Sequence, residues 1–372
     1  MPNPGLKLLN LGKATQKGSS SANAKDTNSS IIVISTTMPQ DDRQKLLALI
    51  QDQHPAKVKI LSRNKNYELR EGNSALVPTK FQLSNSIIKV EEKYFVLGNK
   101  EVKNYRLGRG QFGSVKRIVF EIKLTKTDLQ ISEPQEPMAV KIIDLKKTLN
   151  IDNEKNASQV LDKLIAYGKG SEKGYLVMHE YKEPTVKQKL TESPETYSFI
   201  ERLGTLIYLA ENLITLHKAG WLHGDIAAGN VMMSGNLIDM GEATPKNSSS
   251  IKDTGTPAYR APEASIKPLS TQSEMFSFGC LVAEMMGAIN FSSERVTEMG
   301  VVAEKALNLQ NLGFIIGKNG EKIEELSEEM INALTALINR MTSITNQRPK
   351  FEEVKDELSS LQQYLQPPPC VL

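Results

Sequence analysis

Three polar residues in one short stretch of the chain, Trp221 to Ala243, have the types and spacing that chemistry on phosphate groups requires. Asp225 and Asn230 stand in the pattern D-x-x-x-x-N, and Asp239 follows after an apolar, strand-like segment. A carboxylate can accept the proton of an attacking hydroxyl, while an amide oxygen and a second carboxylate can hold Mg²⁺ on nucleotide phosphates. The stretch predicts phosphoryl transfer, with ordinary turn formation by Asp and Asn as the alternative.

A glycine-rich stretch precedes it by about a hundred residues and has strand-like sequence on both sides. Leu107 to Val115 reads L-G-R-G-Q-F-G-S-V. Glycines let backbone amides approach phosphates closely because no Cβ stands in the way. A dinucleotide-binding interpretation requires a helix at the last glycine, whereas Ile118 to Ile122 predicts a second strand. We therefore expect a phosphate-covering loop between two antiparallel strands, with a plain glycine turn as the alternative.

The following segments predict two strands, one of which carries a lysine. Met138 to Ile143, M-A-V-K-I-I, predicts a strand that carries Lys141. Thr125 to Pro137, which contains two prolines, predicts a long surface connection before this strand. Glu154 follows in a segment that predicts a short helix. Tyr175 to Tyr181, Y-L-V-M-H-E-Y, predicts a further strand.

In content and in order, these motifs resemble the eukaryotic-type protein kinase superfamily. The resemblance implies an α+β, bilobal protein-kinase fold, with a β-rich N-lobe, a helical C-lobe and ATP-Mg²⁺ between them, Mn²⁺ being the alternative metal. It also implies that Lys141 orients the phosphates, Asp225 takes the hydroxyl proton, and Asn230 and Asp239 hold the metal. In this family a helix glutamate pairs with the lysine; Glu154 is the candidate, and a solvated helix residue is the equal alternative. The resemblance further implies that the strand from Tyr175 to Tyr181 ends at the nucleotide base. The ATP-binding residues that it implies are Leu107, Gly108, Gly110, Phe112, Gly113, Val115, Ala139, Lys141, Glu154, Met178, Glu180 and Tyr181.

A peptide-docking segment distinguishes this chain from the small-molecule phosphotransferases, which resemble it in the sequence H-G-D. Gly255 to Glu263 reads G-T-P-A-Y-R-A-P-E, the family's activation segment. The resemblance implies that this segment, which contains Thr256 and Tyr259, positions the substrate peptide and that Arg348 pairs with Glu263. Glu274 to Met286 resembles the family's central helix, which normally begins with Asp. A protein substrate is therefore favoured, with an aminoglycoside-kinase type of enzyme as the alternative.

The acceptor hydroxyl and the regulation depend on two further positions. Thr256 and Tyr259 favour serine/threonine specificity. Ala227, in D-I-A-A-G-N, instead resembles the tyrosine-kinase loop and leaves tyrosine or dual specificity as the alternative. Gly224 stands where most protein kinases have an arginine that binds a phosphorylated activation loop. We expect activity that does not depend on activation-loop phosphorylation. His217 and His223 are interpreted as structural histidines.

The composition is that of an ordinary globular protein. The chain has 372 residues, of which 39% are hydrophobic and 24% charged, and a net charge of +3, too small to indicate nucleic-acid binding by itself. Two cysteines predict neither a disulfide framework nor a cysteine-rich metal site. No apolar run is long enough to span a membrane, and the first positions lack the apolar core of a leader peptide. A soluble protein is expected.

The domain organisation follows from changes in composition along the chain. The predicted parts are a disordered tail over 1–30, an accessory extension over 31–84 with a strand and an amphipathic helix, a kinase domain over 85–365 that divides near 181/182, and a flexible tail over 366–372. The mixture resembles effector kinases of intracellular bacteria. The expected location is the cytoplasm or, for such an effector, the host cytosol.

Two further interpretations concern roles other than catalysis. The sequence I-I-G-K-N-G-E-K-I, around Gly317 to Gly320, resembles the nucleic-acid-binding loop of KH domains. The helical pattern that follows leaves no room for such a domain, so a loop between late helices is favoured and nucleic acid is not an expected partner. A scaffold pseudokinase is the other alternative, which the presence of Lys141, Asp225, Asn230 and Asp239 disfavours. The sequence does not indicate an oligomeric state.

Overall fold

The computed structural model describes most of the chain from Ile32 to Leu365. The described residues are 32–34, 37–51, 58–60, 66–69, 81–82, 87–98, 105–110, 113–148, 151–251, 254–288, 309, 311–317 and 320–365. The predicted tails at 1–30 and 366–372, Phe112, and positions 318 and 319 of the KH-like motif lie outside them. The domain boundaries at 84/85 and 181/182 stay predictions.

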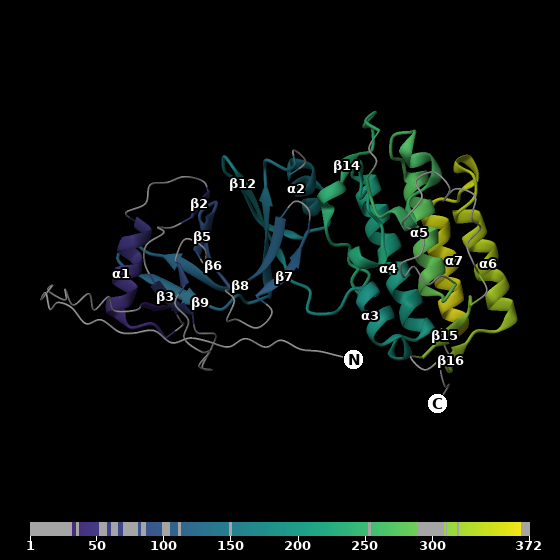
Figure 1. Ribbon diagram of the computed structural model, residues 1–372, viewed down its shortest axis with the longest axis horizontal. Helices are drawn as coiled ribbons and strands as arrows, with labels where there is room; N and C mark the ends of the chain where they lie inside the picture. Colours follow the sequence, from purple (N-terminus) through teal and green to yellow (C-terminus); the bar gives the residue numbers. More distant parts are fainter. Residues whose placement is uncertain are drawn as a thin grey trace, which may run out of the picture. The chain divides into compact units, whose positions relative to one another are not determined.

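Strands dominate the first half of the described chain, and helices dominate the second half (Figure 1). The strands are β1 (Ile32–Ile34), β2 (Val58–Ile60), β3 (Asn66–Leu69), β4 (Phe81–Gln82), β5 (Ile87–Val90), β6 (Lys93–Leu97), β7 (Arg106–Arg109), β8 (Gly113–Leu124), β9 (Leu129–Ser132), β10 (Met138–Asp144), β11 (Leu164–Lys169), β12 (Lys173–His179), β13 (Trp221–Leu222), β14 (Thr244–Pro245), β15 (Phe314–Ile316) and β16 (Lys322–Glu325). The α-helices are α1 (Gln40–Gln51), α2 (Ile151–Val160), α3 (Val186–Glu192), α4 (Phe199–Lys218), α5 (Thr271–Met285), α6 (Glu328–Met341) and α7 (Phe351–Leu365).

One large antiparallel sheet carries the expected glycine loop and the lysine strand. Its hydrogen-bonded order is β11-β12-β10-β8-β6-β5-β2, and β7 and β9 also pair with β8. The strands that precede the glycine loop, β5 and β6, therefore continue the same ladder through β8. Strand β5 also lies against β11, which is far from it in this order, so the sheet curls round on itself.

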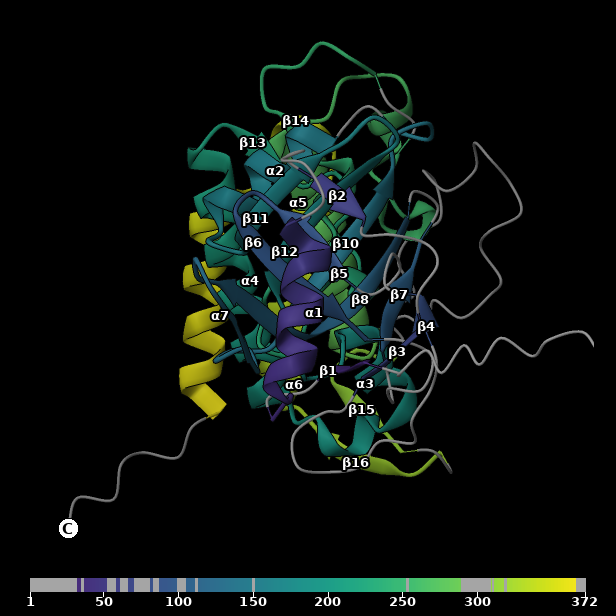
Figure 2. The same ribbon diagram turned by 90° about the vertical axis from the view of Figure 1, so that its left-hand side faces the viewer.

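Alternation along the strands divides the apolar side chains between the two faces of this sheet. On β6, Phe95 and Leu97 point to the inside of the curl, where they pack with Val140 of β10 and Val177 of β12. Val96 points to the other face and joins the cluster that Leu46 of α1 completes. Figure 2 shows α1 lying across the strands. The predicted strand and amphipathic helix near residues 31–50 are confirmed.

The connection from Thr125 to Pro137 differs from the prediction. It was expected to be a surface loop, but Leu129–Ser132 forms β9 and pairs with the far end of β8. Leu129 is fully buried under α1, because its side chain belongs to the same apolar cluster as Leu46 and Phe120. The two prolines mark only the final part of this connection, after the strand has ended.

The helices begin where the sequence provides caps. Ser198 and Glu201 form a capping box at the start of α4, and Ser270 forms one with Ser273 at the start of α5. The buried faces of α4, α5, α6 and α7 share one apolar core. The KH-like motif contributes the strands β15 and β16 of a separate two-stranded sheet between α5 and α6. No α-helix in the described ranges has the length and apolar character needed to cross a membrane.

Candidate active site

The catalytic stretch forms two short turns that face each other. Strand β13 pairs with β14, and the chain between them passes through the 3₁₀ turns Ala228–Asn230 and Met240–Glu242. The amide of Ile238 donates a hydrogen bond to the carbonyl oxygen of Asn230 at 2.9 Å, which joins the two arms. His223 Nε2 lies 3.2 Å from the Ile238 carbonyl oxygen and fixes the same arm, so this histidine has the structural position that was predicted.

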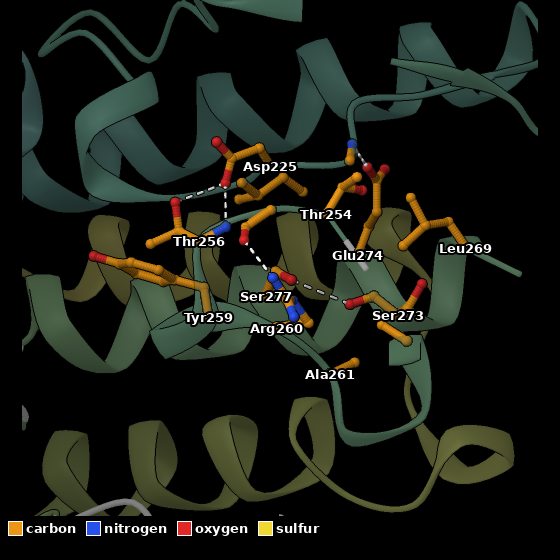
Figure 3. Close-up of a pocket in the computed structure, with 14 residues that line it drawn as sticks. Asp225, Thr254, Thr256, Tyr259, Arg260, Ala261, Leu269, Ser273, Glu274 and Ser277 are labelled. Atoms are coloured by element: carbon orange, nitrogen blue, oxygen red, sulfur yellow. Dashed lines mark hydrogen bonds between the residues drawn. The ribbon is translucent and has the colours of Figure 1, made fainter. Parts of the chain in front are cut away.

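The carboxylate of Asp225 is held from two sides. Asn230 Nδ2 donates to its Oδ2 at 2.7 Å. The backbone amide and the hydroxyl of Thr256 donate to its Oδ1 at 2.6 and 2.7 Å (Figure 3). An ionised carboxylate accepts about four hydrogen bonds, so Asp225 keeps the capacity to receive one more hydroxyl group. The predicted base and the predicted activation-segment threonine are thus in direct contact.

Lys141 joins the sheet to the catalytic stretch. Its Nζ lies 2.5 Å from Oε1 of Glu154 on α2 and 2.6 Å from Oδ1 of Asp239. Burial by itself lowers the pKa of Lys141, but the two carboxylates outweigh this effect and hold the pKa above its usual value. The lysine therefore remains a cation. Glu154 is buried, and the interpretation of it as a solvated helix residue does not apply.

The backbone of Asp239 has a conformation that is rare for a residue with a side chain. Its φ and ψ are 59° and 72°, and its side chain accepts a hydrogen bond from the amide of Gly241. Such a conformation is unfavourable by about 1–3 kcal/mol and persists only where its surroundings impose it. Here the ion pair with Lys141 holds the carboxylate in the cleft.

A buried carboxylate below the catalytic stretch supports its backbone. Glu274 of α5 accepts a hydrogen bond from the amide of Gly224 at 2.7 Å (Figure 3). Its Oε2 lies 2.6 Å from His217 Nε2. Burial alone would raise the pKa of Glu274, but these two contacts hold it below its usual value. The pairing was not predicted, because His217 was interpreted only as a packed helix-end residue.

Gly224 itself cannot be exchanged easily. Its φ is +82°, and a Cβ at this position would lie 2.6 Å from the carbonyl oxygen of Glu242. Both the backbone conformation and the close approach therefore require glycine. The sequence showed that this position lacks the arginine of most protein kinases. It did not show that the backbone conformation here requires glycine.

The activation segment is anchored at its far end. Arg348 Nη2 donates to Oε2 of Glu263 at 3.0 Å, as the resemblance implied, and its Nη1 also donates to the carbonyl oxygen of Gln272 at 2.8 Å. Tyr259 is buried, and its hydroxyl donates to Glu284. Tyr259 thus packs under the segment, whereas Thr256 lines the cleft.

The predicted nucleotide-binding residues line one cleft, except Glu154, which lies behind Lys141, and Phe112, which lies outside the described residues. Its lining includes Leu107, Gly108, Gly110, Gly113, Val115, Ala139, Lys141, Met178, Glu180, Tyr181, Asp225, Asn230, Asp239 and Thr256. A Cβ on Gly113 would lie 2.0 Å from the carbonyl oxygen of Ile142, so the loop requires glycine where it joins β8. The glycine loop, the lysine strand and the catalytic stretch therefore enclose the same space.

The sequence did not predict two basic residues of this cleft, Lys163 and Arg117. Lys163 is buried and donates to the hydroxyl of Tyr181 at 2.8 Å, and burial lowers its pKa to about 8. Arg117 of β8 forms an ion pair with Glu180. Neither residue stands in a motif, and both contacts join segments that are separate in the sequence.

A lysine held by a helix glutamate, facing a carboxylate, an amide and a second carboxylate across one cleft, defines a phosphotransferase site of the protein-kinase type. Comparison with known families agrees. The family model described as "Protein kinase domain" matches residues 102–358, which is more than half of the chain. The chain belongs to the protein kinase family, and the predicted bilobal α+β fold is confirmed.

Individual relatives match at low identity. The serine/threonine-protein kinase STK11 of Rattus norvegicus is 28% identical over 183 residues, which cover 42% of this chain and 39% of that protein. The probable serine/threonine-protein kinase PknB of Corynebacterium glutamicum is 28% identical over 128 residues, which cover 32% of this chain and 20% of that protein. The serine/threonine-protein kinase pkn2 of Myxococcus xanthus is 24% identical over 215 residues, which cover 49% of this chain and 26% of that protein. The matches thus span two fifths or less of these relatives.

Proposed function

We propose that this protein transfers the γ-phosphate of ATP to serine and threonine hydroxyls of protein substrates. The observation that carries the proposal is the arrangement around Lys141, Asp225 and Thr256. Lys141 is held as a cation at the cleft, and Asp225 faces the segment that would receive a peptide. The names of the relatives, which are serine/threonine-protein kinases, support the choice of acceptor.

A divalent metal fits the residues of the catalytic stretch. Mg²⁺ binds through one or two protein oxygens together with phosphates and water, and it does not require a cage of protein ligands. Asn230 and Asp239 offer such a pair, and the described residues contain no cluster of three or more His, Cys, Asp or Glu that would form a cage. Mg²⁺ is the metal that we propose, with Mn²⁺ as the alternative, and it would neutralise charge on the phosphates.

The side chains have separate tasks in this mechanism. The Lys141 ammonium would bind the phosphate oxygens, with Glu154 fixing its position. The glycine loop would exclude water and offer backbone amides. Asp225 would accept the proton from the acceptor hydroxyl, which forms the new bond to phosphorus as ADP leaves. Thr256, bonded to the same carboxylate, would set the distance of the peptide from it.

The experiment is transfer of labelled γ-phosphate from ATP to generic proteins and to the kinase itself, with identification of the modified residue. We expect labelled serine or threonine for the wild type and loss of at least about a thousand-fold in Asp225→Ala. Asp356→Ala, an exposed change on α7, is the matched control. Transfer to tyrosine would overturn the choice of acceptor. Transfer only to a small molecule, despite the anchored activation segment, would favour the alternative enzyme class.

The cellular location stays a prediction. We propose the cytoplasm or, for a bacterial effector, the host cytosol. Detection of the tagged protein in fractions of the producing cell and of an infected host cell would decide between them.

A further inference from the structure

A charged pair, Arg117 and Glu180, lies beside Ala139 and Met178 at the cleft face of the sheet. In the strand register, Arg117 of β8 stands opposite Ala139 of β10, and Ala139 stands opposite Met178 of β12. Directly opposed residues of paired strands share a face, so these three side chains form one row. Lys141 stands on the same face, two positions along β10, and the cleft lining contains all four. Arg117 thus lies one row away from the lysine that would hold the phosphates.

The guanidinium of Arg117 is held in a fixed plane. Its Nε lies 3.0 and 2.9 Å from the two carboxylate oxygens of Glu180, and its Nη2 also bonds to Oε1. The Glu180 side chain is only 3% exposed, whereas that of Arg117 is 27% exposed. The backbone amide of Glu180 donates to the carbonyl oxygen of Pro137 at 2.8 Å, which fixes the carboxylate relative to β10. A forked, two-oxygen pair of this kind fixes orientation as well as charge.

We propose that Arg117 is a positioning residue for the nucleotide, whose base stacks on the guanidinium plane that Glu180 holds. This inference rests on the proposed function, because it takes ATP as the donor. A planar cation attracts the face of an aromatic ring, and arginine does so better than lysine because its charge is spread over a plane. The small side chain of Ala139 beside it leaves room for a ring. Glu180 satisfies the charge of the guanidinium before any ligand binds.

The test measures the binding of the base and the binding of the phosphates separately. Calorimetry gives the dissociation constants of Mg·ADP, adenosine and inorganic tripolyphosphate for the wild type, Arg117→Leu and Arg117→Lys. We expect Arg117→Leu to weaken adenosine about ten-fold and to leave tripolyphosphate within two-fold, because only the base meets the guanidinium. Arg117→Lys keeps the charge but not the plane, so we expect it to restore less than half of the loss on a logarithmic scale. Lys123→Leu, an exposed change on the same strand, is the control.

A second variant keeps the test valid where Arg117→Leu disturbs the fold by leaving a buried carboxylate unpaired. The double variant Arg117→Leu/Glu180→Leu removes both charges, and we expect the same ten-fold weakening of adenosine with an unfolding temperature near that of the wild type. Unchanged adenosine binding in the double variant, or equal weakening of adenosine and tripolyphosphate, would overturn the inference. If the wild type binds Mg·ADP and the variants give either of these results, the inference fails but the proposed kinase function stands.

Discussion

Removal of the Glu154 carboxylate tests the central ion pair most directly. Lys141 is 8% exposed and Glu154 is 4% exposed, and their charged atoms lie 2.5 Å apart. Breaking a buried pair by removing one partner costs about 3–5 kcal/mol, because the remaining charge is left without compensation. In this site Asp239 still contacts Lys141, at 2.6 Å, and offsets part of the loss. We therefore expect Glu154→Ala to lower the free energy of unfolding by about 2–3 kcal/mol.

The same change should slow phosphate transfer. Without Glu154, the contact with Asp239 remains, but the ammonium is no longer held from the side of α2, so its position is less well fixed. We expect a decrease in kcat/KM of about a hundred-fold, equivalent to about 2.7 kcal/mol of transition-state stabilisation. Urea unfolding followed by circular dichroism gives the stability, and labelled ATP gives the rate. Gln159→Ala, an exposed change on the same helix, is the control. Stability within about 0.5 kcal/mol of wild type together with an unchanged rate would refute the reasoning.

Three further changes test other parts of the structure. Gly224→Ala should lower the free energy of unfolding by about 1–2 kcal/mol more than Gly220→Ala, because both glycines have φ near +83° but only Gly224 lies against a backbone oxygen; equal losses in urea unfolding would contradict this. Burial raises the pKa of Glu284 to about 7. The folded state thus binds this proton more tightly than the unfolded state, and the unfolding free energy should fall by about 2–3 kcal/mol as the pH rises from 4.5 past 7. Glu284→Gln should remove this slope, and a slope that persists would assign it to another group. Leu46→Ala should lower the unfolding free energy by about 2–5 kcal/mol, because the side chain is fully buried, whereas the exposed Lys45→Ala should change it by less than about 1 kcal/mol.

The sequence was sufficient for the parts of the site that are local. Asp225, Asn230 and Asp239 stand within one short stretch, and the turns that join them follow from their own residues. Lys141 was recognisable because its strand follows a glycine loop. Glu154 was named, but its pairing was not decided, because a short helix pattern does not show which face is buried.

The contacts that the sequence did not reveal join distant segments. The Arg117–Glu180 pair connects β8 to the end of β12, and its existence depends on the register of three strands. The pairing of His217 with Glu274 likewise depends on how α4 crosses α5. Alternation predicts strands one at a time, whereas register is set by the packing of the whole sheet. The same reason explains why β9 was missed, because its partner is the far end of a long strand.

Because the sheet curls on itself, its strands should unfold as one cooperative unit. Phe95 of β6 packs with strands that carry the nucleotide site, and β6 shares its hydrogen-bond ladder with β8. Strands joined in this way open together, so slow amide exchange should be shared by β5, β6, β8, β10 and β12. A recombinant fragment that begins at residue 102, where the family match begins, would lack β6 and expose the apolar surface around Val140. The strands β5 and β6, which precede the family match, are therefore part of the cooperative unit that holds Lys141 in place.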